Sequence, residues 1–287
     1  MVRRGLAATR SEAALAIRSG RVVVSGSPAM KAGSLILADE PISVQGAPRR
    51  FVSRGGEKLE AALARFGIDV RGVHALDAGA STGGFTDCLL SRGAEQVIAI
   101  DVGYGQLDWR LREDPRVTVL ERTNVRDLDP HDLPYRPSVV TADLSFISLR
   151  LVLPALVRCG RVDGRFVLLV KPQFEAGRQD VGGGGVVREP GVWRKVLTDV
   201  VQACRDERLE VIGTVASPLV GPAGNVEFFV YARGPAADAG VAERVDAGVA
   251  EHLQDGVTAE IEAAIREGLA LRSLVGASAP EGDGNDG

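Results

Sequence analysis

A glycine-rich stretch that follows an apolar run is the part of the sequence whose residue types point most directly to chemistry. Residues 76–85 read Leu-Asp-Ala-Gly-Ala-Ser-Thr-Gly-Gly-Phe and lie between a predicted strand and a predicted helix. The dinucleotide fingerprint G-x-G-x-x-G does not fit, because Ser81 stands where its second glycine would let the backbone approach a pyrophosphate. A phosphate-binding P-loop does not fit either, because no Gly-Lys-Ser/Thr follows. The stretch therefore favours a ligand without a pyrophosphate.

A carboxylate that could bind a ribose follows this stretch. Asp101 ends the next predicted strand, and a carboxylate roughly 20 residues beyond such a loop is placed to bind ribose hydroxyls. In this order, the two features fit an adenosine ligand that lacks a pyrophosphate, and S-adenosylmethionine is the obvious one. The simpler alternative is a tight strand-to-helix turn with an incidental aspartate. The combination of features favours the cofactor.

Seven apolar, β-rich segments can position these residues. They are 73–77, 96–101, 117–120, 138–143, 165–171, 210–216 and 226–232. Amphipathic segments lie between most of them, at 85–92, 149–159 and 192–208. This alternation predicts an α/β fold, a parallel sheet covered on both faces by helices. Ligands of such sheets bind beyond the C-terminal ends of the strands, where the strand order reverses.

The overall composition excludes several classes of protein. The chain has 287 residues, a formal net charge of −4, 45% apolar residues and 25% charged residues, which argues against a collagen-like, disordered or disulfide-stapled chain. No apolar run is long enough to span a bilayer, and the N-terminus lacks an apolar signal core. The three cysteines lie far apart and share no ligand spacing with the three histidines, so we expect reduced cysteines, no metal and a cytoplasmic protein.

Charge is distributed unevenly along the chain. Residues 1–65 contain 11 basic and 5 acidic residues, whereas residues 235–287 contain 3 basic and 11 acidic ones. A basic N-terminal part is typical of a nucleic-acid partner, although the solvated surface of an arginine-rich protein would look the same. The acidic part contains an amphipathic stretch at 257–271, which predicts a packed terminal helix followed by a disordered tail beyond Gly276.

The N-terminal residues predict a small α+β domain. We expect a helix at 13–17 capped by Ser11, strands at 21–24, 34–37 and 42–44, and a turn at 25–28. This part resembles the RNA-binding module of the small-subunit ribosomal protein S-four type. The resemblance is carried by Gly5-Leu6-Ala7, Thr9-Arg10-Ser11, Ala14, Ile17, Gly20, Val22, Val24, Gly26, Lys31 and Ile42-Ser43-Val44. The module usually begins several residues earlier, so its first helix is expected to be shortened at Met1.

The resemblance implies that basic side chains of this module contact RNA phosphates, which positions the protein without reading sequence. The candidates are Arg3, Arg4, Arg10, Arg18, Arg21 and Lys31. A linker is expected to follow at 45–57, where Pro48 breaks regular structure and Gly55 and Gly56 loosen the chain.

The rest of the chain contains a series of motifs in a fixed order. They are Ser53-Arg54-Gly55-Gly56-Glu57-Lys58-Leu59, Leu76 to Thr86, Asp101-Val102-Gly103-Tyr104-Gly105-Gln106-Leu107, Glu121-Arg122-Thr123-Asn124, Ala142 to Leu149, Val170-Lys171-Pro172-Gln173-Phe174-Glu175, and Ser217-Pro218 through Gly224-Asn225-Val226-Glu227. Together they resemble the FtsJ-like 2'-O-ribose methyltransferases. The whole chain is similar to the TlyA family, ribosomal RNA cytidine-2'-O-methyltransferases that are also named hemolysins.

The resemblance implies four domains or segments and a partner. Residues 1–44 would bind ribosomal RNA, 45–57 would be the linker, 58–234 would form a Rossmann-like, doubly wound, seven-stranded methyltransferase domain, and 235–287 would hold the acidic helix and the tail. A monomer that does not bind membranes is expected. The target nucleotide, and whether one or both ribosomal subunits are substrates, stay open.

The resemblance implies that four charged residues catalyse the reaction. The set falls on Lys58, Asp143, Lys171 and Glu227, which lie at or just beyond predicted strand or helix ends. The simpler alternative is surface charge for the lysines and helix capping for the carboxylates. Methyl transfer from a sulfonium to a ribose hydroxyl mainly requires positioning of the reactants and removal of a proton. Lys171 is then either the base or a group that orients the hydroxyl.

The resemblance also implies the residues that bind S-adenosylmethionine. Those around the methionine and the sulfonium would be Asp77, Gly79, Ser81, Thr82 and Gly83; Asp101 would hold the ribose, and Val102 and Asn124 would lie beside the adenine. The four glycines at 182–185 cannot hold one shape unaided. They form either a loop that orders over bound RNA or a surface linker.

Three other functions are considered. A membrane-lytic protein is disfavoured because the chain has no spanning segment and no basic amphipathic helix. A catalytically inactive RNA-binding or assembly factor is disfavoured because all four charged positions are present. A nicotinamide-dependent dehydrogenase is disfavoured by the glycine spacing.

Overall fold

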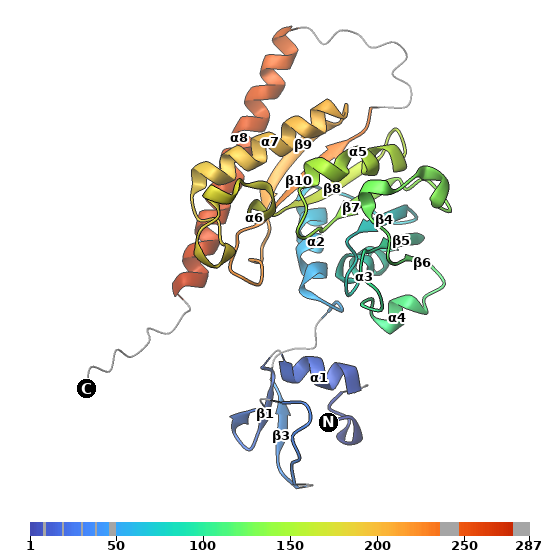
Figure 1. Cartoon of the computed structure of the whole chain (residues 1–287), viewed down its shortest axis with the longest axis vertical. Helices are drawn as coiled ribbons and strands as arrows, with labels where there is room; N and C mark the ends of the chain where they lie inside the picture. Colours follow the sequence, from blue (N-terminus) through green and yellow to red (C-terminus); the bar gives the residue numbers. More distant parts are fainter. Residues whose placement is uncertain are drawn as a thin grey trace, which may run out of the picture. The chain divides into compact units, whose positions relative to one another are not determined.

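A computed structural model describes residues 1–7, 10–18, 20–29, 31–37, 39–45, 50–235 and 247–277. The chain divides into two compact units, Met1–Arg49 and Arg50–Gly287. The second unit contains a seven-stranded sheet, and the first contains a three-stranded sheet (Figure 1).

The larger sheet has the strand order β6-β5-β4-β7-β8-β10-β9. Its strands are β4 (His74–Ala78), β5 (Gln96–Ile100), β6 (Val117–Leu120), β7 (Val139–Ala142), β8 (Arg165–Val170), β9 (Glu210–Ala216) and β10 (Phe228–Arg233). All seven overlap the predicted segments, so the prediction of a doubly wound, seven-stranded α/β sheet is confirmed. The strand order reverses between β4 and β7, which is where ligands of such sheets bind.

One strand runs against the others, which corrects the prediction of a parallel sheet. β10 pairs antiparallel with both β8 and β9, whereas the remaining neighbours pair in parallel. Residues 217–227, which the structure describes throughout, contain no helix. A parallel partner would require a crossover connection, usually a helix, so the chain turns back and pairs antiparallel.

Helices cover both faces of the sheet (Figure 1). On one face, α5 (Leu149–Cys159) and α7 (Pro190–Asp206) pack against the strand residues that include Leu76 and Leu168. On the other face, α2 (Arg54–Arg65) and α3 (Gly84–Ser91) pack against the alternate residues, which include Ala75 and Leu169. Alternation along each strand therefore divides the core in two, as expected for a sheet buried on both sides. The shorter helices are α4 (Trp109–Arg112), α6 (Pro172–Glu175), η2 (Val125–Asp127), η3 (Pro130–Asp132), η4 (Arg178–Asp180) and η5 (Gly183–Gly185).

The start of α2 differs from the expected linker at 45–57. Ser53 caps the helix by accepting a hydrogen bond from the backbone of Gly55, so residues 54–57 are helical. A Cβ atom on Gly56 would lie 2.3 Å from the ring of Phe51, and one on Gly84 would lie 2.9 Å from the backbone nitrogen of Gly56. The expectation that the two glycines loosen the chain is therefore wrong: they let α2 pack closely against its neighbours.

A long helix, α8 (Ala247–Ala277), covers the edge of the sheet at β9. Its apolar residues Ile261, Ala264 and Ile265 are buried in the same core as α7. The backbone N–H of Ala216 in β9 donates a hydrogen bond to the Glu267 carboxylate at 3.2 Å. The predicted helix at 257–271 lies within α8. Of the tail expected beyond Gly276, Ala277 belongs to α8 and residues 278–287 lie outside the described residues.

The smaller unit contains η1 (Val2–Arg4), α1 (Arg10–Arg18), β1 (Val22–Val24), β2 (Ser27–Pro28) and β3 (Ile42–Val44). Its three strands pair antiparallel in the order β2-β1-β3. Two expectations for this unit are wrong. Ser11 lies within α1 rather than at its cap, and residues 34–37 form no strand, because the backbone N–H and C=O of Leu37 bind the side chains of Glu40 and Arg4.

Candidate active site

The reversal of β10 brings Glu227 to the edge of the sheet where the parallel strands end. Asp143 follows β7 and Lys171 follows β8, so both lie at the C-terminal edge. Glu227 precedes β10, and because β10 is antiparallel its first residues lie at the same edge. Phe228 pairs with Val170, so Glu227 and Lys171 are the residues that adjoin this pair at the same edge of the sheet.

The four charged residues form two ion pairs. Lys58 Nζ lies 2.5 Å from Glu227 Oε2, and Lys171 Nζ lies 2.6 Å from Asp143 Oδ1. Lys171 also donates a hydrogen bond to Ser145 Oγ at 3.0 Å. The first pair is almost sealed from solvent, with residue exposures of 6% for Lys58 and 1% for Glu227. Each charge is paired, which is what burial of an ion requires.

Lys58 reaches this edge from the first turns of α2. The Ser53 cap starts the helix, and the glycine contacts described above hold its first turn against α3. Val52, just before the cap, donates its backbone N–H to Asp87 Oδ2 at 2.8 Å, which anchors the approach of the chain to the helix. The position of Lys58 therefore depends on three small residues and one carboxylate that the sequence places around it.

The glycine-rich loop lies beside Asp143. Gly79 has φ of 85° and Gly83 has φ of 95°, in the left-handed region that favours glycine. A Cβ atom on Gly79 would lie 2.5 Å from the backbone oxygen of Asp143, and one on Gly83 would overlap the side chains of Leu107 and Leu111. The loop therefore has no space for larger residues at these positions, and it joins the predicted cofactor site to the ion pairs.

Asp77 is a buried carboxylate with one unused oxygen. Its Oδ2 accepts hydrogen bonds from the backbone N–H and the hydroxyl of Thr86, at 2.9 and 2.7 Å. Its Oδ1 has no hydrogen-bond partner among the described residues. Burial raises the pKa of Asp77 to about 7, and the negative charges of Asp143 and Asp101 act in the same direction. A ligand with an ammonium group, such as the methionine part of S-adenosylmethionine, would satisfy this oxygen.

Asp101 organises the second predicted cofactor loop. Its carboxylate accepts hydrogen bonds from the backbone N–H of Ser81 at 2.8 Å and of Gly103 at 2.6 Å. The N–H of Asp108 donates to the carbonyl oxygen of Thr82 at 3.2 Å, so the loops after β4 and β5 are bound to each other. Each carboxylate oxygen keeps a lone pair for a ribose hydroxyl. The predicted ribose contact therefore fits the geometry.

The two predicted adenine neighbours lie on the same side of the sheet, after β5 and β6. Val102 is 75% exposed, so it offers an apolar surface on which a flat ring such as adenine could pack. Asn124 caps η2 by accepting the backbone N–H of Arg126 at 3.1 Å, which gives it a structural role as well. The donors and acceptors of these loops fit S-adenosylmethionine, and the role of each residue stays a prediction.

Four residues of this region were not assigned a role from the sequence. Phe146 is 91% exposed and has φ of 64°, which is unusual for a bulky residue. Its ring centroid lies 5.1 Å from that of Phe174. Ser145, which precedes Phe146, accepts a hydrogen bond from Lys171, and Glu175, which follows Phe174, is buried. An exposed aromatic ring next to the Lys171 pair can stack on a base that is not paired.

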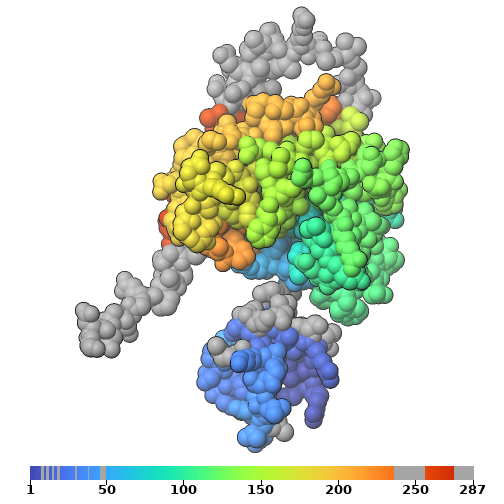
Figure 2. Space-filling model, in the orientation of Figure 1, coloured from blue at the N-terminus to red at the C-terminus, as the bar shows by residue number. Residues whose placement is uncertain are grey.

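A buried side chain holds the glycine segment at 182–185 by hydrogen bonds to its backbone and to the residues that follow it. Asn225, which is 1% exposed, accepts the backbone N–H of Val187 and donates to the carbonyl oxygen of Gly185, both at 2.9 Å. Asn225 lies two residues before Glu227, so the glycine segment is tied to the strand that carries a charged residue of the site. The segment belongs to the yellow surface in Figure 2. Its ordering over RNA stays a prediction.

The predicted RNA-contacting residues lie in the smaller unit. Arg3, Arg10 and Lys31 are exposed. Arg4 donates hydrogen bonds to the carbonyl oxygens of Glu40 and Leu37, and Arg21 donates to that of Gln45, so these two also stabilise the unit. The side chain of Arg18 lies outside the described residues. RNA contact by this set stays a prediction.

The described residues contain neither a candidate metal site nor a candidate membrane-spanning helix. No group of three or more His, Cys, Asp or Glu in this part of the chain could hold a metal ion. Among the same residues, no helix has both the length and the apolar character needed to cross a membrane. Cys88, Cys159 and Cys204 are buried and form no disulfide.

The strand order and the glycine-rich loop at its reversal are those of a Rossmann-like α/β domain that binds its ligand at the strand ends. Residues 51–234 match the model of the FtsJ-like methyltransferase family. The chain belongs to this family.

The chain is similar to curated and solved proteins. It is 51% identical over 234 residues to the 16S/23S rRNA (cytidine-2'-O)-methyltransferase TlyA of Mycobacterium tuberculosis, covering 81% of this chain and 87% of the relative. It is 39% identical to Hemolysin A of Brachyspira hyodysenteriae, covering 79% and 95%. A solved structure of a protein named as a hemolysin from Streptococcus thermophilus matches 96% of both chains, with a TM-score of 0.74 and 36% identity. The resemblance to the TlyA family is confirmed.

Proposed function

We propose that this protein uses S-adenosylmethionine to methylate the 2'-hydroxyl of cytidine in ribosomal RNA. The observation that carries the proposal is the presence of two lysine–carboxylate pairs, Lys58–Glu227 and Lys171–Asp143, at the strand ends beside the glycine-rich loop. The similarity to the M. tuberculosis TlyA protein, whose name gives this reaction, supports the substrate.

The cofactor would be held by the loops after β4 and β5. Asp77 would bind the ammonium of the methionine part, the backbone of Gly79 to Gly83 would surround it, and Asp101 would bind the ribose. When bound, S-adenosylmethionine supplies a methyl group on a sulfonium that is already a good leaving group. The tasks left to the side chains are to orient the ribose oxygen and to handle its proton.

Lys171 is the residue that we assign to the ribose hydroxyl. Asp143 and Ser145 fix the position of its Nζ, and only 11% of its side chain is exposed. As a neutral amine it would accept the proton of the hydroxyl, and as an ammonium it would orient the oxygen by donating a hydrogen bond. Glu227 lies at the same edge of the sheet and is neutralised by Lys58, so the second pair keeps the site free of an uncompensated charge.

Substrate binding would use both units. Phe146, beside the Lys171 pair, would stack on the base of the target nucleotide once it is unpaired. Arg3, Arg10 and Lys31 of the smaller unit would contact phosphates. A ribosomal RNA substrate implies a cytoplasmic location, and this location stays a prediction.

The proposal is tested with each isolated ribosomal subunit and S-adenosylmethionine labelled in its methyl group. We expect label in the RNA of at least one subunit, and nuclease digestion followed by mass spectrometry should recover it as 2'-O-methylcytidine. The Lys171→Ala variant, which can neither accept the proton nor orient the oxygen, is the control for contaminating activity. Label on a base, or no label although the protein binds the cofactor, would contradict the proposal.

A further inference from the structure

The segments that follow β7 and β8 each carry one half of the Lys171–Asp143 pair. Residues 143–148 lead from β7 into α5, and residues 171–175 lead from β8 through α6. Both segments leave the sheet at its C-terminal edge, and neither is part of a strand. The 2.6 Å contact between the two charges therefore depends on how the segments are held relative to each other.

Glu175 connects the far ends of these two segments. Its Oε2 accepts a hydrogen bond from Ser148 Oγ at 2.5 Å, and its Oε1 accepts one from the backbone N–H of Leu149 at 2.6 Å. Arg150 Nε donates to Oε2 at 3.3 Å, and Arg150 Nη2 donates to the backbone oxygen of Glu175 at 3.2 Å. Four hydrogen bonds thus join the end of α6 to the first residues of α5.

Capping of α5 does not by itself explain this carboxylate. Ser148 already caps the helix by accepting the backbone N–H of Arg150 at 3.2 Å. Glu175 is only 7% exposed, and burial raises its pKa, so its charge is kept at a cost that the hydrogen bonds and Arg150 offset. A buried carboxylate that reaches 26 or 27 residues back along the chain is a connection between segments rather than a local cap.

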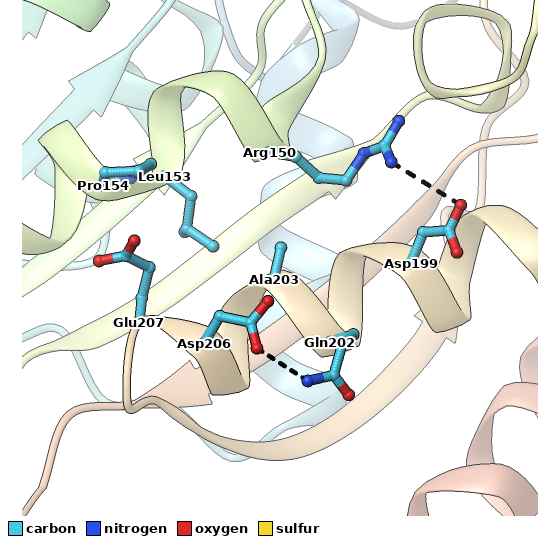
Figure 3. A pocket seen from close by; sticks show the side chains of 8 residues that line it. All are labelled: Arg150, Leu153, Pro154, Asp199, Gln202, Ala203, Asp206 and Glu207. Atoms are coloured by element: carbon cyan, nitrogen blue, oxygen red, sulfur yellow. Dashed lines mark hydrogen bonds and ion pairs between the residues drawn. The ribbon is translucent and has the colours of Figure 1, made fainter.

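Arg150 extends the connection to α7. Its guanidinium lies 3.8 Å from Asp199, across a groove between α5 and α7 of about 430 Å³ (Figure 3). Arg150 is thereby held between Glu175 and a helix of the core, which limits its movement. The carboxylate of Glu175 therefore joins the segment that carries Lys171 to the start of α5, which in turn contacts α7 through Arg150.

We propose that Glu175 is a positioning residue for methyl transfer, which sets the geometry of Lys171, Asp143 and Phe146 by locking the two segments together. This inference rests on the proposed function. Glu175 acts through other residues and does not touch the reacting atoms. A misplacement of about 1 Å at a reacting group costs a rate factor of roughly 100, so loosening the lock should slow the chemical step while leaving cofactor binding, which uses other loops, intact.

The test compares Glu175→Gln with the wild-type chain in single-turnover methylation of the subunit that the wild type modifies. We expect the methyl-transfer rate to fall about 10- to 100-fold, with the dissociation constant for S-adenosylmethionine within about twofold of wild type. Glu262→Gln is the matched control, because it removes a glutamate that also pairs with an arginine, Arg194, away from the site. We expect wild-type rates from this control. Glu175→Asp keeps the charge and replaces the glutamine variant if that variant does not fold.

A combination with Ser145→Ala separates positioning from a general loss of stability. If Glu175 acts by placing the segment that holds Ser145, the double variant should be no slower than the slower single variant, because both changes disturb one arrangement. Independent multiplication of the two effects, or a rate for Glu175→Gln within twofold of an active wild type, would overturn the inference. Absence of methylation by the wild type would instead contradict the proposed function.

Discussion

The buried pair Lys58–Glu227 allows the contributions of charge to stability and to catalysis to be separated. Replacement of Glu227 by Gln leaves the Lys58 ammonium in a site where the residue is only 6% exposed. Removing one partner of a buried pair costs about 3–5 kcal/mol of the free energy of unfolding. For a domain of this size, about 2–4 °C is lost per kcal/mol, so the unfolding temperature should fall by roughly 6–20 °C.

A double variant completes this experiment. Lys58→Met combined with Glu227→Met replaces the pair by apolar side chains of similar length, and such replacements are often neutral or stabilising. We expect calorimetry to show that the double variant regains most of the lost stability, and methylation assays to show that it stays inactive. The reasoning would be refuted if Glu227→Gln unfolded within about 2 °C of wild type, or if the double variant were active.

Four further predictions concern the cofactor loop, the reacting group and the RNA. Lys171→Arg should abolish methylation but keep cofactor binding, because arginine cannot be deprotonated; normal turnover in a methylation assay would exclude the base role. Phe146→Ala should lower kcat/KM for RNA by about 5- to 140-fold, as expected from the loss of about 1–3 kcal/mol of base stacking, and Phe146→Trp should restore kcat/KM. Burial raises the pKa of Asp77 to about 7 in the folded protein, whereas the unfolded chain loses this proton near pH 4. The free energy of unfolding without cofactor should therefore fall as pH rises from about 4 to about 7. Urea unfolding measured at several pH values should show a weaker dependence of this free energy on pH for Asp77→Asn than for the wild type. The logarithm of the RNA affinity should fall linearly with the logarithm of salt concentration, and Arg3→Ala or Arg10→Ala should each reduce that slope by about one; unchanged slopes would exclude phosphate contacts by these residues.

The sheet could be predicted from the sequence because each strand is a short apolar run bounded by turns or amphipathic segments. This signal located all seven strands, including the edge strands β6 and β9. The direction of β10 could not be predicted in the same way, because direction depends on the connection at 217–227 and not on the strand residues. In the smaller unit, residues 34–37 resemble a strand in composition, but the side chains of Glu40, three residues away, and of Arg4, 33 residues away, bind the backbone of Leu37.

In the candidate site too, some features could be predicted from the sequence and others could not. The glycine-rich loop and Asp101 could be found from spacing alone, because a strand, a loop and a helix follow one another in sequence. The pairing of Lys58 with Glu227 spans 169 residues, and it exists because an antiparallel strand begins where a parallel strand ends. The part played by Glu175 could not be seen either, since its partners become neighbours only when α5 and α6 are packed.

The position of α8 has a consequence for how copies of this chain behave at high concentration. An outermost strand offers unpaired backbone groups on which a foreign strand can assemble, and this is a common route to aggregation. Along β9, a carboxylate of α8 occupies such a group, because Glu267 accepts a hydrogen bond from the N–H of Ala216. The last described helix thus covers the outer edge of β9, and a strand from a second molecule cannot add to the sheet there.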